Sequence, residues 1–459
     1  MEQPIMIKKQ NSDGRDVNVG FIDLPDEVVH HILNLQGAEL RDLARLSMVS
    51  KRCRELCIST PNLLLSNIDT DDKFKSFVDK FMALRCLHGV WTVRFQIRWS
   101  FDEADAQADQ YRAVETWLQR AVASGGGVAN VRLQFIHLRK ASQSQSQSHS
   151  FALPLCVMRC NSLRFLEVDA GNGVLKLPSP PYFATKLRML ILSNVKIEND
   201  SNIGALFSSF KSLEVLWFDN VSGIKSMSIS SSSLQILSIT SFDSRLCDID
   251  IQQVDKLHDL NLLWHAKPCT AAAGRGGSRR SLTISAPNLR KFHFSGFAVD
   301  HYCMSEAPHL WQATIALLLR GVNQAAANKN NLDKILHSVK KATNLTIGVG
   351  FEEGMSPREQ QHSLKMEDWE SQNLMFTHQL KTVTVKLFDG VKEIELIKYL
   401  LKNAQELQAI VILYTSPMSS DFLTDELTKY KKPSTKWRLY STSSYILNMG
   451  RVFHRKMVQ

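Results

Sequence analysis

An apolar-x-x-apolar-x-apolar pattern recurs along most of the chain, from about residue 85 onward. In "LRMLIL", for example, Leu187 is followed by apolar residues three and five positions later. The last two apolar positions alternate with a variable one, so they lie on one face of a short β-strand. The copies begin at Val90, Val128, Leu163, Leu187, Leu213, Leu234, Leu257 and Leu289, with weaker copies at Leu310, Ala342, Leu380 and Leu407.

The spacing of these copies indicates a repeat architecture. Between Leu163 and Leu257 successive copies begin 24, 26, 21 and 23 residues apart, within the period of roughly 20–29 residues that leucine-rich repeats have. One copy cannot bury its apolar face alone, whereas stacked copies form a continuous core and a parallel sheet. The sequence therefore predicts an α/β fold, an irregular leucine-rich-repeat solenoid over residues 85–355 with a parallel β-sheet on the concave face and helices on the convex face.

The turns after the strands depart from a regular solenoid. Many leucine-rich repeats carry asparagine or cysteine eight residues after the first leucine, where the side chain satisfies backbone groups of the turn. Here those positions hold Val195, Val221, Phe242 and Phe297. We expect packing to close these turns instead, with a less uniform arc. The insertions Ser142–Ser150 and Thr270–Ser281 have too little apolar content to pack and are expected to be loops.

A different, helical pattern precedes the repeats. In "DLPDEVVHHIL", Pro25 suits the first helical position, and two carboxylates follow in the first turn, where they oppose the helix dipole. An apolar stripe follows on this helix, formed by Val28, Val29, Ile32 and Leu33. Gln36 and Gly37 end it, and a second amphipathic helix is predicted from about Ala38 to Leu56, stopped by "TPNL".

These helices have two possible uses. The segment of about 45 residues is too small to bury much by itself, and its helices carry more apolar surface than they can hide among themselves. The helices could cap the repeat array, or they could form a docking surface for another helical protein.

At these residues the chain resembles the F-box, the helical module that inserts into the small adaptor subunit of SCF-type cullin–RING ubiquitin ligases. The opening Leu-Pro of the module corresponds to Leu24 and Pro25, and "VSKRC" corresponds to its "VSKRW", with Cys53 in place of the usual tryptophan. The resemblance implies binding to the adaptor subunit, and through it to cullin and RING proteins. The residues it implies for adaptor binding are Leu24, Pro25, Val28, Ile32, Leu33, Leu43, Val49 and Cys53.

A second resemblance lies near the other end of the sequence. His378–Tyr414 is similar to the FBD domain, found mainly in plant F-box proteins with irregular leucine-rich repeats. The matching parts are a strand "LKTVTVKLF", a turn "DG", a helix "EIELIKYLLKNA" and a strand "LQAIVIL". We therefore expect a disordered N-terminus at 1–20, an F-box at 21–66, the repeat array at 85–355 and an FBD-like region closing the array at 360–459.

Charge and hydropathy change this picture little. The net charge is +10 on 459 residues, and the densest basic stretches are Gly274–Arg280 and Lys429–Arg438. We interpret both as solvated loops, because a nucleic-acid footprint forms one stripe with interleaved aromatics, so nucleic acid is not the expected partner. No apolar window of transmembrane length and no signal-peptide pattern occurs, which predicts a protein of the cytoplasm, the nucleus or both, without a membrane partner.

The sequence offers no chemistry of catalysis. The spacings Cys53/Cys57 and Cys156/Cys160 lack further ligands, so we expect buried free thiols rather than a metal site. Phosphate-loop, nucleophile-elbow and zinc-protease motifs are absent, and "GVGFEEG" has the wrong spacing for a nucleotide loop. No cofactor, metal or catalytic residue is therefore predicted.

The resemblance implies a non-catalytic receptor subunit whose repeats hold a target protein for ubiquitination. Intervening residues on the concave face, such as Arg188, Glu214, Gln235 and His258, are the natural target surface, and the target itself is unknown. The alternative is a non-degradative leucine-rich-repeat interaction scaffold whose N-terminal helices only cap the array.

Overall fold

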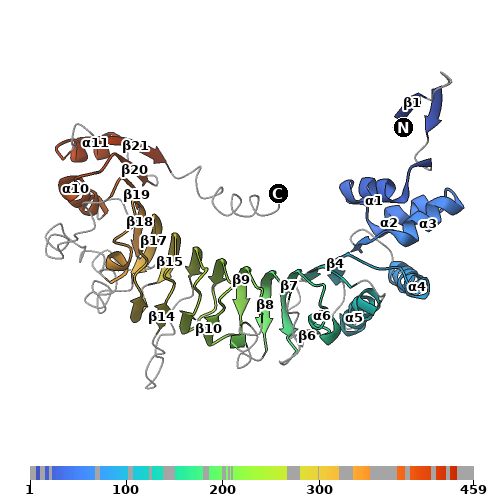
Figure 1. Cartoon of the computed structure of the whole chain (residues 1–459). Helices are drawn as coiled ribbons and strands as arrows, with labels where there is room; N and C mark the ends of the chain where they lie inside the picture. The colour runs from blue at the N-terminus through green and yellow to red at the C-terminus, as the bar shows by residue number, and fades with distance from the viewer. Residues whose placement is uncertain are drawn as a thin grey trace, which may run out of the picture. The chain divides into compact units, whose positions relative to one another are not determined.

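A computed structural model gives the arrangement of these elements in space (Figure 1). The chain divides into two compact units, Met1–Leu213 and Glu214–Gln459, which are described one after the other. The residues that the structure describes are 7–10, 16–19, 23–67, 73–101, 107–123, 127–137, 150–178, 186–198, 203–204, 207, 210–265, 280–297, 299–319, 334–351, 380–387, 393–414, 420–430 and 435–441.

The N-terminal segment contains a short hairpin. Strand β1 (Ile7–Gln10) pairs antiparallel with β2 (Asp16–Val19), with Ile7 opposite Val19. The structure therefore differs from the expectation that residues 1–20 are disordered throughout, because backbone pairing orders these two stretches.

Three helices follow where the sequence predicted two. They are α1 (Asp26–Leu35), α2 (Leu40–Ser47) and α3 (Lys51–Ser59). The predicted second helix is divided at Ser50, whose backbone is extended and whose hydroxyl accepts a hydrogen bond from the Cys53 N–H at 3.0 Å. This side-chain cap begins α3, so a continuous apolar periodicity spans a break in the backbone.

The first unit continues from these helices into a parallel sheet. Its strands are β3 (Asn62–Ser66), β4 (Arg94–Phe101), β5 (Asn130–His137), β7 (Phe165–Lys176) and β8 (Met189–Ile197), paired in that order. A short strand, β6 (Ser150–Ala152), also pairs with β7. Helices α4 (Lys73–Leu87), α5 (Gln107–Ala123) and α6 (Leu155–Met158) lie between strands in the chain.

The sheet begins earlier than the sequence analysis placed it. Strand β3 lies within the predicted F-box and pairs with β4, so the first strand of the array starts at Asn62 rather than near residue 85. Its sequence "NLLLS" is continuously apolar in the middle, and this masks the repeat pattern.

The second unit is built on a longer parallel sheet. Its strands pair in the order β9, β11, β13, β15, β17, β18, β19, β20 and β21. Their bounds are Val215–Ser222, Ile236–Ser241, Asp259–Trp264, Lys291–Phe297, Gln312–Leu319, Asn344–Phe351, Thr382–Leu387, Ala409–Tyr414 and Lys436–Ser441. The predicted repeats coincide with these strands up to β20, and β21 is an addition that the pattern did not reveal.

In the middle repeats, the layer that packs behind the main sheet is a second parallel sheet, where the sequence analysis expected helices. Its strands pair in the order β10 (Ser226–Ser230), β12 (Asp248–Gln252), β14 (Ser281–Ile284) and β16 (His301–Met304). Figure 1 shows β10 and β14 below the strands of the main sheet. The prediction of convex helices is therefore wrong for these repeats, because chain stretches of four or five residues suffice for a strand but not for a helix.

The turns after the strands close as expected in three of four cases. Val195, Val221 and Phe297 are buried, and the residues that precede the two valines, Asn194 and Asn220, have φ values of 50° and 55°. This left-handed conformation, which asparagine tolerates, bends each strand so that the valine enters the core. Phe242 is the exception, since its side chain is 59% exposed.

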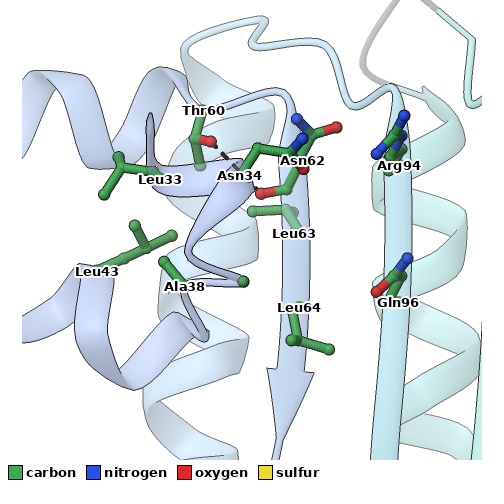
Figure 2. A pocket seen from close by; sticks show the side chains of 11 residues that line it. Leu33, Asn34, Ala38, Leu43, Thr60, Asn62, Leu63, Leu64, Arg94 and Gln96 are labelled. Carbon is green, nitrogen blue, oxygen red and sulfur yellow. Dashed lines mark hydrogen bonds between the residues drawn. The ribbon is translucent and has the colours of Figure 1, made fainter. Parts of the chain in front are cut away.

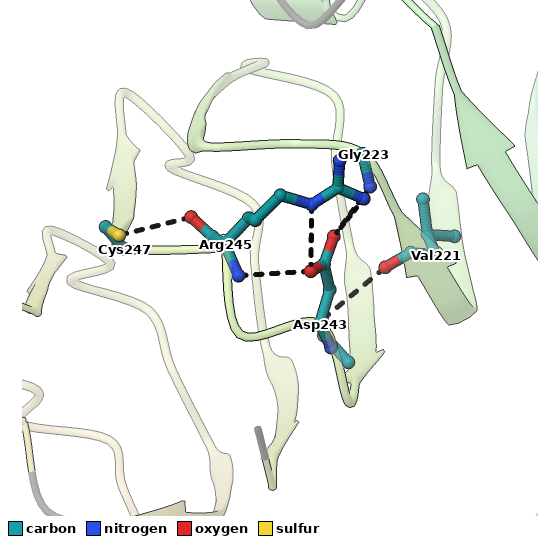
Figure 3. Close-up of polar contacts among 6 residues, drawn as sticks. Val221, Gly223, Asp243, Arg245 and Cys247 are labelled. Atoms are coloured by element: carbon teal, nitrogen blue, oxygen red, sulfur yellow. Dashed lines mark hydrogen bonds and ion pairs between the residues drawn. The ribbon is translucent and has the colours of Figure 1, made fainter. Parts of the chain in front are cut away.

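A polar contact replaces packing at the exceptional turn (Figure 3). The Asp243 carboxylate accepts hydrogen bonds from the Gly223 N–H at 2.7 Å and from the Arg245 guanidinium at 3.1 and 3.2 Å. Burial raises the pKa of Asp243, but these hydrogen bonds outweigh it and hold the pKa below its usual value. The carboxylate therefore joins two successive repeats while Phe242 points outward.

The C-terminal part has the predicted strand–helix–strand order. Helix α10 (Glu393–Asn403) follows β19 and precedes β20, and it packs against β19 through a buried apolar side that includes Ile397 and Leu400. Helix α11 (Ser420–Thr428) follows, and Lys398 on α10 lies 3.1 Å from Glu426 on α11. Helices thus cover the main sheet near this end, as the sequence predicted.

Candidate partner-binding surfaces

The three N-terminal helices already enclose a core of their own. Val29, Leu40 and Leu56 are completely buried, and Leu43 and Cys53 are 2% and 1% exposed. Leu43 and Cys53, which the sequence analysis expected to contact the adaptor, are therefore buried within their own chain. The smaller Cys53 fills a core position under the cap at Ser50.

Apolar side chains also remain outside this core. Val28 is 43% exposed and Val49 67% exposed, as expected of contact residues, and Pro25 is exposed as well. Leu35 and Met48 are 70% and 75% exposed, although the sequence analysis did not select them. Both lie at a helix end, where the apolar periodicity does not predict which side chains are buried.

An ion pair joins the start of α1 to the start of α3. The Arg52 guanidinium at the start of α3 donates to the Asp26 carboxylate at the start of α1. Val28 lies two residues after Asp26 and Val49 three residues before Arg52, so one contact holds both apolar segments near each other. At the other end of α1–α3, the His30 ring nitrogen Nε2 lies 3.0 Å from the Leu56 carbonyl oxygen. We call Pro25, Val28, Met48 and Val49 the exposed helical face.

The remaining predicted contact residues are only half-buried. Leu24, Ile32 and Leu33 each keep part of their surface exposed, so the strands of the chain do not enclose Ile32 and Leu33. Leu33 lines a half-open groove of about 200 Å³ between the helices and strands β3 and β4 (Figure 2). The other lining residues are Asn34, Gly37, Ala38, Leu43, Thr60, Asn62, Leu63, Leu64, Arg94 and Gln96.

A buried arginine ties the helices to the array. Arg85 of α4 is 1% exposed, and its guanidinium donates to the Ile58 carbonyl in the last turn of α3. It also donates to the Trp91 carbonyl at 3.0 Å and to the Thr92 hydroxyl at 3.2 Å, just before β4. Burial lowers the pKa of Arg85 to about 10, so the side chain stays charged at neutral pH. Arg85 therefore connects the last turn of α3 to the residues that lead into β4.

The described part of the chain shows no arrangement typical of catalysis or metal binding. No group of three or more His, Cys, Asp or Glu side chains that could hold a metal ion occurs among the described residues. Burial raises the pKa of the Cys57 thiol to about 11, which keeps it protonated and unreactive. Within the described residues, no helix combines the length and the apolar character needed to cross a membrane.

The predicted target-binding residues lie at the edge where strands begin. The Gln235 N–H donates to the Glu214 carbonyl at 2.8 Å, and the His258 N–H donates to the Gln235 carbonyl at 3.0 Å. These three residues are half-buried and occupy equivalent positions on successive repeats of the second unit, while Arg188 is exposed in the first unit. The backbone thus aligns equivalent side chains in rows across the repeats.

The basic stretches and inserted loops can be compared with their predictions only in part. Arg280 was expected in a solvated loop, but it is 1% exposed and its guanidinium lies 5.2 Å from the Trp264 ring centre. Lys436 and Arg438 are exposed on β21, within the other basic stretch. The loop predictions for 142–149 and 270–279 fall outside the described residues.

Comparison with known protein families agrees with both the N-terminal helices and the strand repeats. An F-box domain model matches residues 21–65, which end in β3. A model for the leucine-rich repeats of FBD-associated F-box protein At5g56370 matches residues 114–296, from α5 to the end of β15. These matches confirm the resemblance and the fold class that the residues indicated, a helical F-box followed by parallel-strand repeats.

A curated relative carries the same combination of modules. The chain is 26% identical over 291 residues to a putative F-box/FBD/LRR-repeat protein, At4g03220, of Arabidopsis thaliana. The match covers 60% of this chain and 51% of the relative, so it spans about half of the relative's length.

Proposed function

From the place of this chain in the F-box/FBD/leucine-rich-repeat family, we propose that it is the substrate-recognition subunit of an SCF-type cullin–RING ubiquitin ligase. The F-box binds the adaptor subunit, which connects it to cullin and RING proteins. The repeats bind a target protein. The chain itself contributes no catalytic group and acts by holding the target near the charged ubiquitin-conjugating enzyme, which makes the encounter local.

The observation that carries this proposal is the exposed helical face. The buried side chains of the three helices are already covered by the chain itself, whereas Val28, Met48 and Val49 remain exposed. Exposed apolar side chains on segments that the Asp26–Arg52 ion pair joins suit a partner that covers them with its own apolar residues. Leu24, Ile32 and Leu33 extend the proposed contact with their exposed parts, and Leu43 and Cys53 support it from inside.

A second candidate function has its own observation. Strand β3 follows α3 directly and pairs with β4, and Arg85 joins α3 to the start of β4, so the helices also close the end of the sheet. A scaffold without a role in degradation would need only this capping. The two functions differ in their use of the exposed helical face. Adaptor binding requires this face, whereas capping requires only the buried residues that contact the sheet.

The test is adaptor capture by variants of the exposed helical face. The double variant Val28→Asp/Val49→Asp places two carboxylates on the proposed interface and is expected to abolish capture of the purified adaptor subunit by the full chain. Leu87→Asp is the matched control, because Leu87 is 85% exposed in the same unit but outside the F-box. Leu24→Ala/Pro25→Ala should weaken capture as well.

The outcomes separate the two candidates. Loss of capture in the face variant with retention in the Leu87→Asp control supports the receptor function. A wild-type chain that captures no adaptor, or a face variant that captures it as well as wild type does, contradicts the receptor function and favours the scaffold. Circular dichroism of each variant shows whether the fold is retained.

The proposed compartment is the cytoplasm or the nucleus, where SCF partners would be met. The cysteines among the described residues are free thiols, including the buried Cys53 and Cys57 and the exposed Cys86, as a reducing compartment favours. Fluorescence microscopy of a tagged full-length chain tests this. Accumulation in the secretory pathway would contradict it.

A further inference from the structure

The edge where strands of the second unit begin carries a row of cationic and aromatic side chains. Backbone hydrogen bonds connect the row: the Trp311 N–H donates to the Arg290 carbonyl at 3.1 Å, Thr343 N–H to Trp311 at 3.2 Å, and Lys381 N–H to Thr343 at 3.0 Å. Arg290, Trp311 and Lys381 are exposed. Lys291, next to Arg290, holds its ammonium 5.9 Å from the Trp311 ring centre. We call Arg290, Lys291, Trp311 and Lys381 the cationic row.

The charges of the surrounding surface are unbalanced. From β13 to β21, the edge position and the first and third residues of each strand are half-buried or exposed, apart from a buried threonine at the β21 edge. Lys436 and Arg438 add to the cationic row there, and Asp259 is the carboxylate at these positions. Asp259 lies 3.9 Å from Lys291 and offsets the charge of that lysine, which leaves the charges of Arg290 and Lys381. The remaining positions hold no Asp, Glu, Lys or Arg, and several of them are threonines.

On the corresponding face of the first unit, two strand arginines have side-chain partners. Arg132 of β5 donates to Glu167 of β7 at 2.6 Å, and Arg98 of β4 donates to Gln134 of β5 at 3.2 Å. In the second unit, by contrast, no described residue forms an ion pair or side-chain hydrogen bond with the guanidinium of Arg290 or the ammonium of Lys381. Unpaired cations in a row are available to an anionic partner.

The spacing of the row indicates the form of that partner. Arg290 and Lys381 are separated by three strand intervals of about 4.8 Å each, or about 14 Å. An extended peptide advances about 3.4 Å per residue, so residues four apart are separated by nearly the same distance and point to the same side. A residue midway between them would lie close to the exposed indole of Trp311.

We propose that the cationic row binds an extended acidic segment of the target protein, with carboxylates four residues apart on Arg290 and Lys381 and an apolar residue between them near Trp311. This names the class of target for the proposed receptor function and rests on it. Lys436 and Arg438, two strands beyond Lys381, would receive further acidic residues of the same segment.

The experiment measures peptide binding to the full-length chain at low salt. The probe is a fluorescein-labelled peptide with the sequence Ser-Glu-Ser-Leu-Ser-Glu-Ser, followed by fluorescence anisotropy. Arg290→Gln/Lys381→Gln is expected to weaken binding about tenfold, since two exposed charge pairs are lost. The control, Lys186→Gln/Lys211→Gln, removes the same charge from exposed positions of the first unit and should change binding less than twofold.

Two further probes separate the alternatives. The same peptide with glutamine in place of glutamate, and a peptide with its two glutamates adjacent, should both bind several-fold more weakly. Equal weakening by the two double variants, or equal binding of the three peptides, would overturn the proposal. A single-stranded RNA oligonucleotide that binds more tightly than the acidic peptide and displaces it would also overturn it in favour of nucleic acid.

Adaptor capture distinguishes this proposal from the receptor function. Arg290→Gln/Lys381→Gln should capture the adaptor subunit as wild type does, because the row lies outside the F-box. Peptide binding without adaptor capture by wild type would contradict the receptor function alone. Adaptor capture without peptide binding would contradict the acidic-segment proposal alone.

Discussion

The N-terminal helices and the middle repeats satisfy the same physical requirement in different ways. Helices α1 to α3 enclose a small core and leave Val28, Met48 and Val49 exposed. The repeats from β9 to β16 enclose their apolar residues between two parallel sheets, with Leu216, Leu237 and Leu260 completely buried. In the helices, a partner surface is therefore indicated by apolar side chains that remain exposed. In the second unit, it is indicated only by exposed charged and aromatic side chains.

The difference also explains the forms of partner that each region suits. A helical unit with exposed apolar residues can be covered by another folded protein of matching shape. A row of aligned positions across parallel strands repeats at a fixed interval, which matches an extended chain. The two surfaces can be altered independently, because they draw on residues of different units.

The largest effect is expected from a cavity in the repeats. Leu216→Ala removes a completely buried side chain from β9 and should lower the free energy of unfolding by about 2–5 kcal/mol, measured by urea denaturation. Val28→Ala, which removes an exposed side chain, should change the free energy by less than about 0.5 kcal/mol. Similar losses of stability in both variants would mean that Val28 contributes to the folded core and is not free for a partner.

A smaller effect is expected where Arg85 joins α3 to the start of β4. Arg85→Met keeps an unbranched side chain but leaves the Ile58 and Trp91 carbonyls without their charged donor, so we expect a loss of about 2–4 kcal/mol. Arg54→Met, at an exposed position of α3, is the control. Two separate unfolding transitions in Arg85→Met would show that this side chain couples the helices to the array. A single unchanged transition would contradict such coupling.

The smallest effect is expected at the polar turn of the second unit. Asp243→Asn should destabilise the chain by about 1–2 kcal/mol at neutral pH, because the charged acceptor for Gly223 and Arg245 is lost. The lowered pKa of Asp243 means that its stabilisation is present above the unfolded value, near pH 4, and is lost as the pH falls through the folded value.

The difference between wild type and Asp243→Asn should therefore shrink as the pH is lowered below about 4, measured by thermal unfolding at a series of pH values. Asp255→Asn, which changes an exposed carboxylate of the same unit, should show no such trend. A constant difference from pH 3 to pH 7 would contradict the role of the Asp243 charge.

Much of the fold could be predicted because its signals are local. The apolar pattern placed β7, β8, β9 and the later main-sheet strands up to β20, since alternation along a strand is a property of a few neighbouring residues. The short strands of the second sheet were missed although "SMSIS" and "DIDIQ" alternate. Segments this short form strands only when parallel neighbours pair with them, and pairing involves residues from other repeats.

The sequence located the helical segment of the candidate site, but it did not predict which of its apolar residues are exposed. Pro25, Val28 and Val49 are exposed as expected, whereas Leu43 and Cys53 point into the core. On a short helix the apolar stripe serves both the core and a partner, and periodicity alone does not divide it between them. The division at Ser50, which exposes Met48 and Val49, depends on a cap that interrupts a continuous stripe.

The sequence by itself determined the main-sheet strands from β7 to β20, the helical character of the N-terminal segment and the family resemblance, because these follow from the order and spacing of side chains along the chain. Tertiary structure decided which of the apolar and charged residues remain exposed. Arg280 is buried against Trp264, and Phe242 is exposed at a position where its counterparts are buried. Exposure depends on what the neighbouring repeats place opposite each residue, and those neighbours belong to other repeats along the chain.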